Sequence, residues 1–115
     1  MASSAEFKSL RESLQLTTKW LSRRWGITEN SIQRWERNRL PPDDVVEDLQ
    51  GIAQQAEETI IEGVHRDYGT IEVPRLDRDS RDGFPASYHR MIARRIAEQT
   101  GAEIVYRPIV SREVR

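Results

Sequence analysis

The stretch TTKWLSRRWGITENSIQRWE, residues 17–36, decides the fold because it contains two short helical patterns that meet at Gly26. A glycine ends a helix readily, since it adopts the left-handed backbone conformation at little cost. Ser22, four residues earlier, has a side chain small enough for a second helix to approach closely. Apolar residues recur at helical spacing at Leu21, Trp25, Ile27, Ile32 and Trp35. This spacing predicts a helix-turn-helix, and with it DNA binding.

Hydroxyl side chains mark where both helices begin. Thr17 or Thr18 can cap the first helix and Thr28 the second, because their oxygens accept hydrogen bonds from unpaired backbone N–H groups. On the second helix Ile32 and Trp35 share one face. The rest of that helix is polar, and its asparagine, glutamine and arginine side chains are types that pair with base edges in the major groove.

Together with its flanks, FKSLRESLQLTTKWLSRRWGITENSIQRWERNRLPP (residues 7–42) resembles the Cro/C1-type, or XRE, family of helix-turn-helix regulators nearly end to end. The resemblance implies that Arg11 pairs with Glu36, the residue after Trp35. It implies that bases are read by Glu29, Asn30, Ser31 and Arg34. It also implies contacts to the DNA backbone from Thr18, which replaces the family's glutamine, and from Lys19, Arg37 and Arg39.

Charge is distributed unevenly along the chain. Residues 1–42 contain eight Lys or Arg and four Asp or Glu, for a formal charge of +4, while the remainder has ten basic and fifteen acidic residues, for −5. The net charge of −1 therefore hides a positive half, which matters because phosphate neutralisation is local. A chain of 115 residues is about one domain, or a small domain with an appendage. The asymmetry favours a binding half and a separate second half.

Several function classes find little support in the sequence. Without cysteine or an apolar N-terminal run, the chain is expected to be soluble and cytoplasmic, with no membrane partner. His65 and His89 are far apart without a ligand cluster, and the DRDSRD run at 77–82 is interpreted as a solvated loop. We therefore expect no enzymatic activity, no metal and no cofactor. Trp25 and Trp35 are expected in the core, whereas Trp20 could instead stack on bases.

The flanking segments predict further helices and two strands. Ser3 and Glu6 can form a capping box for a first helix with Phe7 and Leu10 on its apolar face. A long helix is expected from about residue 42 to 68, with an apolar stripe that includes Ile60 and Ile61. Beyond it follow a strand at 70–73, a polar loop, a helix at 84–100 that Gly101 ends, and a strand at 103–107.

A strand-helix-strand crossover places its two strands parallel, but a two-stranded sheet is marginal in water. A second subunit could complete it by joining two copies into a four-stranded sheet. We therefore predict a mainly α fold, with a helix-turn-helix DNA-binding domain at 1–68 and a dimerisation module at 69–115. The module's predicted contact residues are Ile71, Val73, Tyr88, Met91, Ile92, Ile96, Ile104 and Tyr106.

This two-part layout is loosely similar to that of the anti-CRISPR-associated autorepressors of phages. The function predicted is a dimeric transcriptional repressor, or autorepressor, of a phage or bacterial operon that binds an inverted repeat in double-stranded DNA. Two alternatives remain open. The chain could be an antitoxin or protein-interaction module whose acidic half binds a protein partner, or a regulator that binds RNA.

Overall fold

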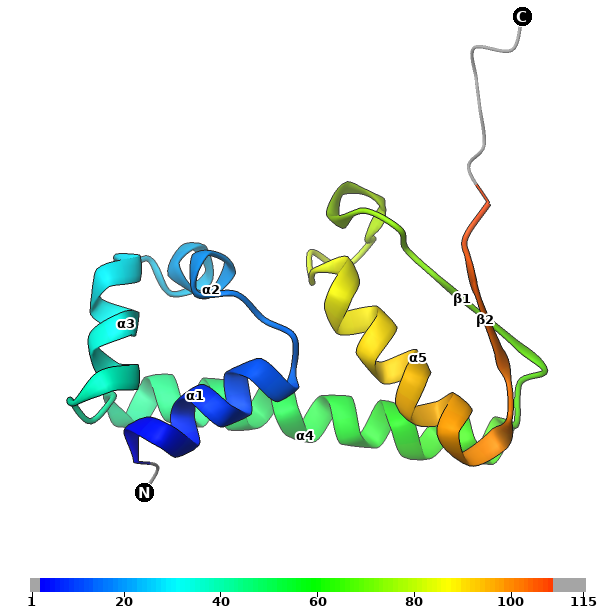
Figure 1. Cartoon of the computed structure of the whole chain (residues 1–115), viewed down its shortest axis with the longest axis horizontal. Coiled ribbons are helices and arrows are strands. Elements are labelled where there is room, and N and C mark those ends of the chain that lie inside the picture. The colour runs from blue at the N-terminus through cyan, green and yellow to red at the C-terminus, as the bar shows by residue number, and fades with distance from the viewer. Residues whose placement is uncertain (1–2, 109–115) are drawn as a thin grey trace, which may run out of the picture.

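The computed structural model describes residues 3–108 and is mainly helical, with a small parallel sheet near the C-terminal end (Figure 1). This confirms the mainly α fold class. In chain order the elements are α1 (Ser4–Ser13), α2 (Thr18–Trp25), α3 (Glu29–Arg37), α4 (Asp43–Arg66), β1 (Thr70–Val73), the 3₁₀ turn η1 (Asp77–Asp79), α5 (Ala86–Thr100) and β2 (Glu103–Tyr106).

The helix ends lie where the capping residues predict them. Ser3 and Glu6 form a reciprocal capping box at the start of α1. Of the two threonines considered for α2, Thr17 is the cap, since its hydroxyl accepts from the Trp20 N–H. Gly26 ends α2 with a φ of 66°, and Gly101 ends α5 with a φ of 76°, both in the left-handed region that glycine adopts without a steric penalty.

Helix α4 is the spine of the molecule (Figure 1). Helices α1–α3 gather over its first half, while α5 crosses its second half and carries the two strands on its far side. The Cα radius of gyration is 16.2 Å, which exceeds the roughly 13 Å of a compact chain of this length. The chain is therefore elongated along α4.

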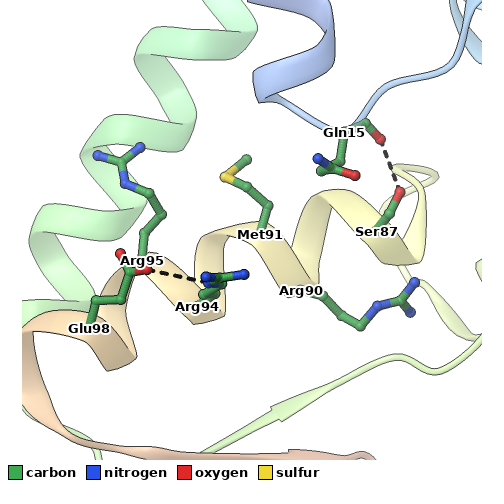
Figure 2. Close-up of a pocket in the computed structure, with 7 residues that line it drawn as sticks. All are labelled: Gln15, Ser87, Arg90, Met91, Arg94, Arg95 and Glu98. Carbon is green, nitrogen blue, oxygen red and sulfur yellow. Dashed lines mark hydrogen bonds and ion pairs between the residues drawn. The ribbon is translucent and has the colours of Figure 1, made fainter.

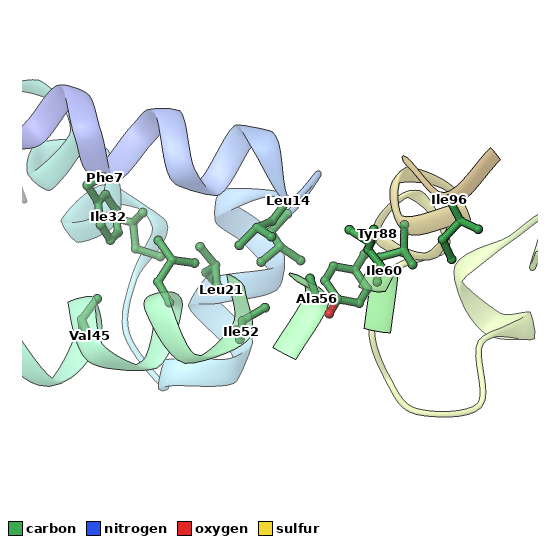
Figure 3. Packing of buried hydrophobic residues seen from close by; sticks show 13 residues of the cluster. Phe7, Leu14, Leu21, Ile32, Val45, Ile52, Ala56, Ile60, Tyr88 and Ile96 are labelled. Carbon is green, nitrogen blue, oxygen red and sulfur yellow. The ribbon is translucent and has the colours of Figure 1, made fainter. Parts of the chain in front are cut away.

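A single hydrophobic cluster follows α4 from one end to the other (Figure 3). Phe7 and Ile32 belong to its first part, and Ile60, Tyr88 and Ile96 to its second. The predicted boundary at residue 68 falls just after α4, but the core continues across it, because the C-terminal segment packs on a helix assigned to the N-terminal domain.

This packing corrects part of the predicted dimer surface. Tyr88, Ile92 and Ile96 on α5 are buried against the chain's own α4, and Val73 on β1 is buried as well. Their apolar area is therefore covered within one chain and is not available to a second subunit. Met91 and Ile71 are half-buried, and Ile104 and Tyr106 are exposed.

The close crossing of α4 and α5 requires Gly63, which the sequence pattern did not single out. A Cβ at this position would lie 2.3 Å from Cδ1 and 2.9 Å from Cγ1 of Ile96. Gly51, on the same helix, is exposed and would have nothing within 4 Å of its Cβ. The two glycines therefore lie in opposite steric environments.

We expect Gly51→Ala to raise the free energy of unfolding by about 0.5–1 kcal/mol, because alanine is the better helix former. Gly63→Ala is expected to lower the free energy of unfolding by about 1 kcal/mol. Overpacking against Ile96 costs about 1–3 kcal/mol, which outweighs the gain from the higher helix propensity of alanine. Urea denaturation of both variants measures the difference. Equal stabilisation by both alanines would show that Ile96 moves aside freely.

Candidate nucleic-acid interface

An ion pair fixes α3 to α1. The Arg11 guanidinium donates two hydrogen bonds to the Glu36 carboxylate, and its Nη2 lies 3.0 Å from Oε1. Arg11 also donates to the Leu16 carbonyl. Both side chains are largely withdrawn from solvent, with exposed fractions of 13% for Arg11 and 7% for Glu36. The pairing that the family resemblance implies is therefore present. It sets the position of α3 relative to the rest of the molecule.

The turn between α2 and α3 is closed by the residues that flank Gly26. The Ile27 N–H donates to the Ser22 carbonyl, and the Ser22 hydroxyl donates to the Ile27 carbonyl. Ser22 thus satisfies its hydroxyl on the local backbone. Leu21 and Ile32 face each other's helices and are fully buried, so the two helices share one core.

Two of the three tryptophans support this arrangement. Trp25 and Trp35 each lie 6.3 Å from the ring of Phe7, measured between ring centroids, and both pack against the core cluster. Their predicted core positions are confirmed. α3 is therefore held on its apolar side by α1 and α2, which leaves its opposite side facing solvent.

The solvent-facing side of α3 carries Asn30, Gln33, Arg34 and Arg37, which we call the polar face of α3. All four side chains are exposed. Within residues 3–108 none of them donates or accepts a side-chain hydrogen bond or forms an ion pair. They are amide and guanidinium groups with free hydrogen-bonding capacity, arranged over two turns of one helix.

The other two predicted base-reading residues have partners in the protein. The Glu29 carboxylate accepts a hydrogen bond of 2.9 Å from the Thr18 hydroxyl, which ties the start of α3 to the start of α2. The Ser31 hydroxyl lies 3.0 Å from that of Thr28, within the N-terminal cap of α3. The structure thus engages Glu29 and Ser31 locally, and it uses the Thr18 hydroxyl that was assigned to the DNA backbone.

Basic residues surround the polar face of α3. Lys19 and Arg39, which are predicted to contact the DNA backbone, are exposed. Arg23 was missed: it is exposed on α2 one turn after Lys19, and the spacing of four residues was the signal that could have identified it. Lys19 and Arg23 place two positive charges on one side of α2.

A second cluster, which sequence reasoning also missed, fixes α2 to α4. Asp48 accepts hydrogen bonds from Arg24 Nε at 2.7 Å and Nη2 at 3.0 Å, and from the Trp25 indole N–H at 2.7 Å. The hydrogen bonds from Arg24 hold the pKa of Asp48 below its ordinary value. Arg24 is therefore a structural residue, and its charge is neutralised within the protein.

Trp20 contacts the segment that precedes α5. Its indole N–H donates to the Gly83 carbonyl at 3.0 Å, and its ring lies 5.0 Å from that of Phe84. Trp20 therefore anchors α2 to the C-terminal half.

The acidic loop interpreted as solvated also has an internal role. Asp77 accepts from the Ala86 N–H at the start of α5, and Asp82 accepts from the Phe84 N–H and lies 2.9 Å from His89 Nε2. Burial raises the pKa of Asp82, while the hydrogen bonds from His89, Phe84 and Ser80 lower it, and the net shift is downward. These carboxylates hold the loop against α5.

A hollow of about 400 Å³ lies along α5 (Figure 2). Its charged and polar side chains bind other protein groups: Arg94 pairs with Glu98, Arg95 with Glu57, and Ser87 donates to the Gln15 carbonyl. Arg94 and Arg95 are thus paired with carboxylates, and Arg90 donates to the Pro74 and Arg75 carbonyls. Between residues 3 and 108, no three His, Cys, Asp or Glu side chains come together as a metal site, and no helix there is long and apolar enough to span a membrane.

Comparison with known proteins gives no match: no family model, no curated protein and no solved structure is significantly similar to this chain.

Proposed function

We propose that this chain is a sequence-specific DNA-binding transcriptional regulator. In this proposal α2 and α3 form a helix-turn-helix of the Cro/C1 type, and α3 enters the major groove as the recognition helix. The protein acts as a homodimer that represses an operon by binding an inverted repeat. Its partner is double-stranded DNA, with no cofactor.

The observation that carries the proposal is the polar face of α3. Asn30, Gln33, Arg34 and Arg37 are exposed and free of protein partners, on a helix whose position is fixed by the Arg11–Glu36 pair. Asparagine and glutamine can pair with adenine, and arginine with guanine. A helix held in place by the protein, whose exposed side chains of these types have no protein partner, suits base recognition.

The surrounding charges support the same function. Lys19 and Arg23 lie on α2, and Arg39 follows α3, all exposed and without ion pairs among the described residues. Basic groups beside a recognition helix neutralise phosphates and set the register of the protein on the duplex. Since Thr18 and Ser31 are engaged within the protein, we assign base reading to Asn30 and Arg34 and backbone contacts to Lys19, Arg37 and Arg39.

Asn30→Ala and Arg34→Ala are each expected to cost about 1–3 kcal/mol in binding a selected site and to relax specificity at one base pair. Arg37→Ala should instead weaken binding to selected and scrambled duplexes alike and reduce the slope of affinity against salt. Fluorescence anisotropy at several salt concentrations measures both effects.

The matched control is Arg66→Ala, which removes an exposed arginine at the distant end of α4. It should leave binding nearly unchanged, which separates a local contact from a loss of overall positive charge. If Asn30→Ala and Arg34→Ala lose affinity equally for selected and scrambled DNA, these residues do not read bases.

The binding sequence itself comes from selection out of random duplex DNA with the purified protein at a stated salt concentration. An enriched inverted repeat with half-sites about 34 Å apart, or a multiple of this distance, is expected for a dimer with two recognition helices. Enrichment of a single half-site would indicate a monomer. If no duplex is enriched and the protein retains structured RNA, a regulator that binds RNA is favoured. If no duplex is enriched and a second protein copurifies, the antitoxin or protein-interaction module is favoured.

A further inference from the structure

The free edge of β2 presents backbone groups that no residue between 3 and 108 pairs. β1 and β2 are parallel, with Ile71 opposite Ile104. The N–H groups of Glu103 and Arg107 donate to carbonyls of the β1 segment, at Gly69 and Val73. Backbone groups alternate in direction along a strand, so the N–H and C=O groups of Ile104 and Tyr106 point away from β1.

The side chains at this edge are apolar and exposed. Ile104 is 38% and Tyr106 is 56% exposed, although both lie on the sheet face that packs towards α5, beside the buried Val73. An edge of this kind is a template for pairing with another strand. Pro108, two residues after Tyr106, has no N–H group and limits the edge to Glu103–Arg107.

We propose that β2 pairs antiparallel with β2 of a second copy, with Val105 opposite Val105 on the two-fold axis. This inference deepens the proposed function, since it rests on the dimer and locates its interface. Ile104 then lies opposite the partner's Tyr106, and the outward N–H and C=O groups of these residues exchange two hydrogen bonds in each of the two symmetric pairs. A continuous four-stranded sheet results, in the order β1-β2-β2-β1.

The charges of the strand select this register. With Val105 on the axis, Glu103 of one copy lies opposite Arg107 of the other, and this happens twice. Opposite charges directly across an antiparallel pair are stabilising, and like charges are destabilising. The segment EIVYR, residues 103–107, is therefore complementary to a second copy of itself. Opposite charges face each other, apolar side chains face each other, and the outward N–H and C=O groups meet in hydrogen-bonding positions.

The free edge of β1 has no such complementarity. Its outward backbone groups belong to Thr70 and Glu72, since those of Ile71 and Val73 face β2. Pairing two copies on this edge places Glu72 opposite either Thr70 or the second Glu72. Neither arrangement brings opposite charges together, so the β2 edge is favoured.

The two-fold symmetry of this dimer determines on which side of the sheet its two α3 helices lie. In an antiparallel sheet formed by a two-fold axis through Val105, the axis is perpendicular to the sheet, so both α5 helices cover the same face. α5 and the α1–α3 helices lie on the same side of the strands (Figure 1). Both α3 helices therefore lie on one side of the four-stranded sheet.

A single cysteine tests the register, because the chain contains none. Facing residues in a non-hydrogen-bonded antiparallel pair have Cα atoms about 4.5 Å apart, within the range that a disulfide spans. Full-length Val105→Cys should thus form a covalent dimer nearly completely under mild oxidation at low micromolar concentration. Glu72→Cys is the matched control: it neighbours Val105 on the same face but lies one strand further from the axis.

Crosslinking of Glu72→Cys in place of Val105→Cys would identify β1 as the interface and overturn the proposal. A dimer by sedimentation in which Val105→Cys does not crosslink would overturn it too, as would a monomeric wild-type protein. Oligomeric state and crosslinking are measured without DNA. A Val105→Cys dimer that binds no DNA therefore keeps the interface and rejects DNA binding. A monomer that binds DNA rejects both the interface and the homodimer but keeps DNA binding by α3.

Charge reversal tests the Glu103–Arg107 contact. Glu103→Arg should weaken dimerisation about tenfold, because two attractive pairs become repulsive. Arg107→Glu should do the same, and the double variant should restore association. Arg107 also donates to the Asp79 carbonyl, so the rescue by the double variant is the decisive result, since a folding defect would not be rescued. Additive weakening in the double variant would reject the register.

Discussion

Glu36→Ala is expected to lower the free energy of unfolding by about 3–5 kcal/mol, the range for breaking a buried ion pair by removing one partner. The guanidinium of Arg11 would remain largely buried, with an exposed fraction of 13%, after losing the carboxylate that accepts two of its hydrogen bonds. The Leu16 carbonyl would still accept from it, and the exposed Glu12 carboxylate would remain 4.0 Å from Nη2. Urea denaturation followed by circular dichroism measures the loss.

Two controls separate the buried charge from the lost contact. Arg11→Met combined with Glu36→Leu removes both charges and should recover most of the stability, because an apolar pair of similar volume is often neutral or better. Glu62→Ala breaks the exposed Arg66–Glu62 pair and should cost less than about 1 kcal/mol. If Glu36→Ala costs no more than Glu62→Ala, Arg11 reaches water in the variant and the pair does not fix α3.

The local structure of this chain was predictable because single residues determine it. Thr17, Thr28 and Gly26 each act on their own backbone neighbours, so the start of both helices and the turn between them follow from residue type. Parallel pairing of the strands was predictable for a similar reason, since a single crossover helix leaves few alternatives. Both predictions are confirmed.

The partner of an apolar stripe was not predictable in the same way. The pattern of Tyr88, Ile92 and Ile96 shows that something covers that face of α5, but its periodicity is equally compatible with a second subunit and with α4. The absence of a side chain at Gly63, which permits the close crossing, looks in sequence like any helical glycine. In the folded chain, packing against α4 rather than against a second subunit covers this face of α5.

At the candidate interface, too, residue type predicted some features, whereas contacts between elements determined others. Residue type identified the polar face of α3, but it did not reveal that Thr18 would bind Glu29 or that Ser31 would join the cap of α3. It also gave no sign that Asp48, in the acidic half by composition, would neutralise Arg24. Which polar groups stay free depends on distances between elements, and a sequence pattern does not contain these distances.

The two halves of the chain are expected to unfold as one unit, because they share the core along α4. Ile60 has an exposed fraction of 1% and lies in the part of the cluster that contacts α5 (Figure 3). Ile60→Ala should lower the free energy of unfolding by about 2–5 kcal/mol, the cost of removing a buried aliphatic side chain and leaving a cavity. The adjacent Ile61 is 55% exposed, so Ile61→Ala should change stability by less than about 0.5 kcal/mol.

The tryptophans show whether this loss reaches the other half. Trp20, Trp25 and Trp35 all lie within α2 and α3, whereas circular dichroism reports all helices. If the halves are coupled, Ile60→Ala shifts the fluorescence and dichroism transitions together to lower urea concentration. If residues 69–115 were an independent module, the fluorescence and dichroism transitions would have different midpoints. A fragment that begins at residue 69 lacks α4, so the apolar face of α5 would be uncovered. Self-association of this fragment would therefore not report on the full-length dimer.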